Sequence, residues 1–267
     1  MVVMPPSEKI RPYKITVLKM GECEVPGPEV YWMSHWDTWE KLFFWMVVIQ
    51  NDRDTILINT GPPEDLTALN QCWSEAVSPR SQMSRAEAEK PANALKELGI
   101  SPEQVGHLIL TPLQAYATGN VPLFPNAKVY ISRKGWIEDF HAPCYEMHIP
   151  RKLRIPDDVL YYLDIKVPDK LHLVDDEEGI LPGIKIFWAG VHHRSSQAIS
   201  IQTARGKVIA SDSFFKFANV EKDLPLGVGE SLQECRATYA RIRKEADLLL
   251  PLYDPEVLTR YPGGVIG

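Results

Sequence analysis

Apolar residues recur along the first half of the chain in short runs that predict β-strands. Residues 13–21 alternate between apolar and polar side chains, as a strand with one buried face does, whereas residues 42–50 are apolar almost throughout. A polar turn at residues 51–54 separates this run from residues 55–61, so the two runs predict a hairpin. Residues 106–111 predict a further buried strand, which ends at a threonine and delivers a polar loop to one edge of a sheet.

Strands and helices also alternate in the second half of the chain. Residues 197–212 predict a hairpin around an Arg-Gly turn, and residues 230–245 predict an amphipathic helix. Two series of strands, each interleaved with helices, predict two sheets packed face to face with helices outside, in a single α+β domain over residues 1–267. Further strands are predicted at residues 171–174, 184–189 and 248–250, an acidic turn at 175–179, and helices at 132–140 and 84–98, with Pro91 either a kink or the true start of the latter.

The composition of the chain argues against nucleic acid and membranes as binding partners. The 267 residues carry a formal net charge of −6, whereas nucleic acid and anionic membranes favour a basic protein face, so we expect neither partner. The chain has no apolar run long enough to span a bilayer, and its first residues lack the pattern of a signal peptide. The four cysteines lie far apart, which favours free thiols in a reducing cytosol. We therefore expect a cytoplasmic protein that binds a small molecule, with a homodimer left open.

The loop after the strand at residues 106–111 carries the first functional signal. It reads Thr-Pro-Leu-Gln-Ala-Tyr-Ala-Thr-Gly, and a turn and another strand follow at residues 124–132. Together these segments resemble the signature region of the metallo-β-lactamase superfamily, especially its lactonase-like and glyoxalase II-like hydrolases, where the loop reads T-H-x-H-x-D-H-x-G. The resemblance implies an αββα four-layer sandwich and a two-metal site. At the four ligand positions of this loop, however, the chain has Pro112, Gln114, Tyr116 and Ala117.

The resemblance continues through the second half. Residues 190–197 resemble the family's P-G-H-T-P-G-S-Q loop, which aligns His192 with a metal-binding histidine. Two later segments align Asp212 with the aspartate that bridges the metals and Tyr253 with the last histidine ligand. Asn59 stands where the family has an aspartate that supports the ligands. Without a cation to balance a buried carboxylate, an amide keeps the hydrogen bonds and avoids the charge.

The chain keeps two of the seven ligand positions that the resemblance implies, His192 and Asp212. Because a catalytic zinc normally has three protein ligands, we expect no metal ligands and no cofactor. His192 and Asp212 would instead hydrogen-bond directly as a general acid/base pair, with His192 titrating near neutrality. Tyr116 and Tyr253 would donate hydrogen bonds to a substrate carbonyl, which completes the expected catalytic set.

A second group of residues is expected to bind substrate. Arg194 suits a substrate carboxylate, and the aromatic stretch 32–39 and the stretch 141–148 are expected to close over the pocket. The expected substrate-binding residues are Gln114, His193, Arg194, Ser196, Trp32, His35, Trp36, His141 and His148.

Three functions remain open at this point. The first is a metal-independent enzyme acting on a small cyclic or aromatic carbonyl compound, by ester or lactone hydrolysis or by proton transfer of the lyase or isomerase type. The second is a non-catalytic member that binds a small molecule or a protein. The third is a hydrolase with one atypical metal at His192 and Asp212. Taken singly, each of these residues is compatible with a plain structural role. Taken together, the five polar residues at ligand positions favour a protonatable pocket; they are Gln114, Tyr116, His192, Asp212 and Tyr253.

Overall fold

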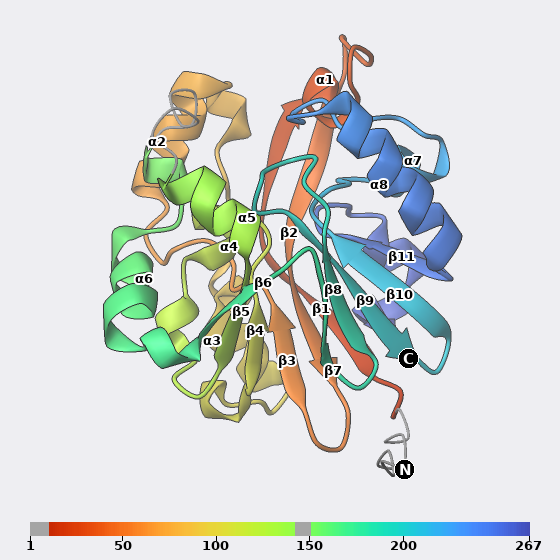
Figure 1. Ribbon diagram of the computed structural model, residues 1–267. Coiled ribbons are helices and arrows are strands. Elements are labelled where there is room, and N and C mark those ends of the chain that lie inside the picture. The colour runs from red at the N-terminus through yellow and green to blue at the C-terminus, as the bar shows by residue number, and fades with distance from the viewer. Residues whose placement is uncertain (1–10, 142–150) are drawn as a thin grey trace.

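Two β-sheets pack against each other in the middle of the molecule, and helices lie on their outer sides (Figure 1). The structure is a computed structural model, and it describes residues 11–141 and 151–267. The order of layers confirms the α+β, αββα sandwich expected from the sequence. No described helix is both long enough and apolar enough to cross a membrane.

The first sheet has seven strands in the order β12-β1-β2-β3-β4-β5-β6. The strands from β12 to β3 pair antiparallel with their neighbours, whereas the strands from β3 to β6 run parallel to one another. The strand bounds are β1 Lys14–Pro26, β2 Trp39–Gln50, β3 Thr55–Ile58, β4 His107–Ile109, β5 Lys128–Ser132, β6 Leu171–Val174 and β12 Val265–Ile266.

The second sheet has five strands in the order β11-β10-β9-β8-β7. The acidic turn predicted at residues 175–179 is wrong in its second half, because β7 begins at Glu177 and pairs with β8. An edge strand turns half of its side chains to solvent, and Glu177 pairs there with Lys185 and Arg241. The strand bounds are β7 Glu177–Leu181, β8 Ile184–Trp188, β9 Gln197–Thr203, β10 Gly206–Ser211 and β11 Leu248–Pro251.

The helices are mostly short. The helix predicted at residues 84–98 begins only at Pro91, because proline is tolerated at the first helical position, where no backbone hydrogen bond is lost. The helix predicted at 132–140 is a short α5 followed by a π-helical segment, Trp136–His141. The helices are α1 Gly27–Val30, α2 Thr67–Ala76, α3 Pro91–Glu97, α4 Ala115–Thr118, α5 Arg133–Gly135, α6 Asp157–Tyr161, α7 Phe217–Glu221, α8 Leu232–Glu245 and α9 Val257–Arg260.

Two apolar clusters hold these layers together. The larger one lies between the sheets and includes Ile49 and Ile58 from the first sheet and Ile199 from the second, all fully buried. The smaller one lies under the outer helices of the first sheet, where Leu95 of α3 and Val159 of α6 are fully buried. This burial on both faces explains why the strand at residues 42–50 is continuously apolar rather than alternating.

The loops that follow five strands converge at one edge of the sandwich. Glu29 follows β1, Tyr116 follows β4 and His192 follows β8. Phe215 and Tyr253 follow β10 and β11 in the same way. Segments far apart in the sequence therefore meet at the ends of the strands, where α/β-type sheets commonly place their sites.

Candidate functional site

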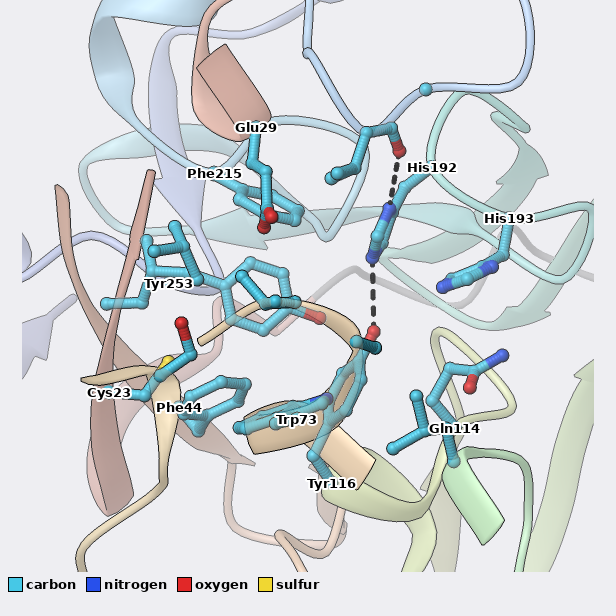
Figure 2. Close-up of a pocket in the computed structure, with 18 of the residues that line it drawn as sticks. Cys23, Glu29, Phe44, Trp73, Gln114, Tyr116, His192, His193, Phe215 and Tyr253 are labelled. Atoms are coloured by element: carbon cyan, nitrogen blue, oxygen red, sulfur yellow. Dashed lines mark hydrogen bonds between the residues drawn. The ribbon is translucent and has the colours of Figure 1, made fainter. Parts of the chain in front are cut away.

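The converging loops enclose a cavity of about 440 Å³ (Figure 2). This volume suits a small organic molecule rather than a polymer. The lining is mostly apolar, with a few polar groups that face the same space. The polar and aromatic lining residues are Cys23, Glu29, Phe44, Trp73, Ser81, Gln114, Tyr116, His192, His193, Phe215, Glu230 and Tyr253.

Aromatic rings form a continuous wall on one side of the cavity. The ring of Phe44 lies 5.8 Å from Trp73, 5.4 Å from Tyr116 and 5.3 Å from Tyr253, measured between ring centroids. Phe215 extends the wall, with its centroid 4.6 Å from that of Tyr253. Stacked, tilted and edge-to-face contacts of this kind hold the rings in fixed positions, so the wall is preformed.

His192 is held by hydrogen bonds to both of its ring nitrogens (Figure 2). Nδ1 lies 3.0 Å from the carbonyl oxygen of Val228, and Nε2 lies 3.1 Å from the hydroxyl of Tyr116. A carbonyl only accepts hydrogen bonds, so Nδ1 carries the proton, Nε2 is the acceptor and Tyr116 donates to it. Burial lowers the pKa of His192 to about 4, so the ring is neutral at physiological pH. The expectation that His192 titrates near neutrality is therefore wrong.

Tyr253 faces the cavity beside Tyr116. Its side chain is buried, and its hydroxyl lacks a hydrogen-bond partner of good geometry within the described chain. Burial raises the pKa of both phenols well above 10, so both stay protonated. Because Tyr116 already donates to His192, Tyr253 is the phenol whose proton remains available to a bound molecule.

Asp212 does not pair with His192. It is fully buried beneath the cavity, where its two carboxylate oxygens accept hydrogen bonds from the hydroxyls of Thr111 and Ser196. Burial raises the pKa of Asp212 to about 7. The predicted His192–Asp212 pair is wrong because the loop after β10 points the carboxylate into the inter-sheet network, and the Val228 carbonyl takes its place at Nδ1 of His192. Ser196, expected to bind substrate, belongs to the same network and is also fully buried.

Asn59 fixes the loop that carries Tyr116. Its side-chain Nδ2 donates to the carbonyl of Thr111 at 2.7 Å, and its Oδ1 accepts from the Thr111 amide at 2.8 Å. Asn59 is buried and has a left-handed backbone, φ 63°. An aspartate would lose the donated bond and bury a charge, so the amide suits a site that has no cation nearby.

Of three further residues expected to bind substrate, one has another role and two remain candidates. Arg194 donates at 2.8 Å to Glu138 and at 2.7 Å to Glu234, and it does not line the cavity, so its predicted contact with a substrate carboxylate is wrong. Gln114 and His193 do line the cavity, and the His193 ring lies 4.0 Å from that of His192.

The tryptophan-rich stretch lies at the surface rather than over the cavity. Trp32 and Trp36 are 50% and 64% exposed, His35 is also exposed, and none of the three lines the cavity. Trp73 of α2 supplies the tryptophan of the wall instead. His148 lies outside the described residues, and the structure describes the backbone of His141 but not its side chain.

Glu29 is a cavity residue that the sequence analysis missed. It lies on the four-residue helix α1, and its carboxylate points into the cavity (Figure 2). Burial alone raises its pKa to about 7. Nothing in its local sequence distinguishes it from the other acidic residues, because only the convergence of loops places it opposite the aromatic wall.

An N-acyl homoserine lactonase from Bacillus thuringiensis is 21% identical over 184 residues, which is 68% of each protein. Among solved structures, an N-acyl homoserine lactone hydrolase with N-hexanoyl-L-homoserine at its catalytic metal centre aligns with a TM-score of 0.72 and 19% identity, over 95% of this chain and 97% of that one. A hydrolase of the β-lactamase superfamily aligns with a TM-score of 0.64 and 14% identity, over 97% and 90% of the two chains.

The chain has the metallo-β-lactamase fold. The resemblance stated from its loop motifs is thereby supported over nearly the whole chain. No family model matches the sequence. A dizinc quorum-quenching lactonase shares the fold, with a TM-score of 0.65 and 15% identity over 97% of this chain and 91% of that one.

The residues at this site do not fit the metal centre that the metallo-β-lactamase fold implies. Both ring nitrogens of His192 and both carboxylate oxygens of Asp212 are already engaged by protein groups. Pro112 and Ala117 offer no donor atom in their side chains, and a protonated phenol is a poor ligand. Across residues 11–141 and 151–267, no group of three His, Cys, Asp or Glu side chains is placed to hold a metal ion.

Proposed function

We propose that this chain is a metal-independent enzyme of the metallo-β-lactamase fold that hydrolyses a small lactone or activated ester. The observation that carries the proposal is the hydrogen bond from Tyr116 to Nε2 of His192 at the cavity wall, next to the Tyr253 hydroxyl. Three of the four similar proteins named above are lactonases or lactone hydrolases, which supports the substrate class. The cavity is also small and mostly apolar, as a lactone or ester of modest size requires.

Proton transfer would run through the Tyr116–His192 pair. A water molecule beside Tyr116 gives a proton to the phenol oxygen, the phenol proton moves to Nε2 of His192, and the hydroxide bonds to the substrate carbonyl carbon. The oxyanion formed on the carbonyl accepts a hydrogen bond from Tyr253. The proton then returns by the same route to the leaving oxygen, the carbon–oxygen bond breaks, and a lactone yields its hydroxy acid.

The electrostatics of this pair limit the chemistry. A neutral His192 with a pKa near 4 is a weak base, and a buried phenol is a weak acid. We therefore expect turnover of strained lactones and esters with good leaving groups rather than of amides. Proton transfer beside a carbonyl would use the same three side chains and remains the alternative reaction type.

The test is hydrolysis of a panel of lactones and aryl esters by the purified protein, with and without a strong chelator. We expect turnover that is unchanged by the chelator, and a loss of about 10²-fold or more in kcat for His192→Gln, the usual size for a general acid/base group. His172→Gln is the matched control, because His172 pairs with Glu178 on the two edge strands away from the cavity. Chelator-sensitive activity that zinc restores would overturn the mechanism.

A binding function without turnover is the second candidate. The observation that favours it is the hydrogen bond from Nδ1 of His192 to the Val228 carbonyl. A neutral carbonyl oxygen stabilises a protonated histidine less than a carboxylate would, so His192 is a weaker base than in a His–Asp pair. Saturable binding of panel compounds with no turnover of any of them would select this function.

A further inference from the structure

The described charged side chains that line the cavity are all acidic. Two carboxylates, Glu29 and Glu230, are among its lining residues, and no lysine or arginine is among the described ones. His192 is neutral because burial lowers its pKa to about 4. Arg194 does not line the cavity. It pairs with Glu138 and Glu234, and its Nε also lies 3.7 Å from a carboxylate oxygen of Glu230, which offsets the charge of Glu230. A ligand that carries a carboxylate would therefore meet Glu29, whose charge no lysine or arginine among the described lining residues offsets.

The Glu29 carboxylate is the charged group of this cavity for which the described chain supplies no ion-pair partner. No side chain or backbone group among residues 11–141 and 151–267 forms a hydrogen bond or ion pair with this carboxylate, and burial raises its pKa to about 7. Its backbone is fixed, because the Glu29 carbonyl accepts from the Val228 amide at 2.8 Å while the Val228 carbonyl accepts from His192. A half-buried carboxylate without a partner is costly in free energy, and a bound cation offsets that cost.

The aromatic wall offers ring faces to the same space. Phe44, Trp73, Tyr116, Tyr253 and Phe215 form one connected group of rings around the cavity. Lysine and arginine side chains lie over several other rings in the described parts of the chain, but over none of these five. An organic ammonium group is attracted by such ring faces as well as by a carboxylate.

We propose that the cavity selects a small organic cation, a protonated amine on an aromatic or alkyl body, with Glu29 as the group that binds the ammonium. This inference deepens the proposed function, on which it rests for the role of the cavity as the substrate site. A carbonyl at the other end of the molecule would face Tyr253 and the Tyr116–His192 pair. The substrate class is then an amine-bearing lactone or ester, and not an acid.

The test compares three probes of one shape, phenethylamine, 2-phenylethanol and phenylacetate, by isothermal titration calorimetry at about pH 8, where the carboxylate of Glu29 is ionised and an alkylammonium is still protonated. We expect phenethylamine to bind about tenfold or more tightly than 2-phenylethanol, the size of one charge-assisted hydrogen bond, and phenylacetate to bind most weakly. In Glu29→Gln the preference for the amine should disappear, while the affinity for the alcohol stays within about twofold.

Two further variants make the result specific. Glu97→Gln removes the same charge from an exposed position at the end of α3, outside the cavity, and should leave all three affinities unchanged. Trp73→Leu removes one ring of the wall and should weaken the amine more than the alcohol. Each variant is checked for a native melting transition before titration, and Trp73→Leu still tests the proposal if Glu29→Gln fails to fold.

The outcomes separate this inference from the proposed function, because binding is measured without turnover. Equal affinities for the amine and the alcohol, tighter binding of phenylacetate, or an unchanged preference in Glu29→Gln would each overturn the cation site. Failure of the native protein to bind phenethylamine would do the same, even if neutral lactones are hydrolysed. Amine selectivity lost in Glu29→Gln, with no hydrolysis of any lactone or ester, would support the cation site and reject the enzyme.

Discussion

The hydroxyl of Tyr116 lies 3.1 Å from Nε2 of His192, and this contact joins loops that are 76 residues apart in the chain. The phenol donates a hydrogen bond to the nitrogen that a histidine ligand would otherwise offer to a metal ion. The same contact leaves Tyr253 as the phenol free to meet a substrate oxygen.

Tyr116→Phe should lower stability and activity together. The substitution leaves the buried Nε2 of His192 without a donor, which we expect to cost about 1–3 kcal/mol in the free energy of unfolding, measured with urea. If the pair relays a proton, kcat on the best substrate should fall about tenfold or more. The tautomer should not change, because the Val228 carbonyl still accepts from Nδ1. Long-range ¹H–¹⁵N NMR of the imidazole checks this, and a proton on Nε2 in the variant would contradict it.

Asp212→Asn should be a stability variant rather than a catalytic one. The carbonyl oxygen of an asparagine can still accept a hydrogen bond from one of the two hydroxyls, of Thr111 or Ser196. Its NH₂ group then faces the second hydroxyl and cannot accept from it. We expect the free energy of unfolding to fall by about 1–3 kcal/mol, while ligand affinity and kcat of the folded protein stay close to native. A large loss of kcat at normal stability would instead restore Asp212 to the catalytic role expected from the sequence.

Glu29→Gln should stabilise the protein in a pH-dependent way. The pKa of Glu29 is about 7 in the folded protein against an ordinary value of 4.5, so the folded state keeps the proton after the unfolded chain has lost it. Stability of the native protein therefore falls as pH rises between these two values, and glutamine removes that loss. We expect equal melting temperatures near pH 4 and a gain of about 2–4 °C for the variant near pH 8, by calorimetry. A gain that is the same at both pH values would show that ionisation is not its cause.

Zinc should not bind stoichiometrically. After dialysis against a zinc-containing buffer and then a zinc-free one, we expect elemental analysis to find far less than one zinc per chain, because the donor atoms of His192 and Asp212 are already engaged. Tyr116→His with Tyr253→His is a useful positive control, since it returns two imidazoles to ligand positions and should raise zinc retention. Tight zinc binding by the native chain would reject this account of the site.

Much of the fold could be predicted from the sequence, because short segments of the chain specify their own strands and turns. Continuous apolar runs such as residues 42–50 specify strands buried on both faces, and the turn at 51–54 specifies the return. The loop motifs around Tyr116, His192 and Tyr253 also placed these three side chains around one cavity, because a motif fixes the backbone that carries it. Pro91 was ambiguous as long as only propensity was considered, and packing of α3 on the first sheet decided it.

The pairing of groups within the site was decided by tertiary structure alone. Whether His192 meets Asp212 or the Val228 carbonyl depends on the direction in which two loops leave different strands, and no spacing in the sequence encodes that direction. The same holds for Glu29, whose pKa and position come from loops that converge from distant parts of the chain. Residue types determine which chemistry is available, whereas burial and the nearest hydrogen-bond partner determine which protons are held and which are free to move.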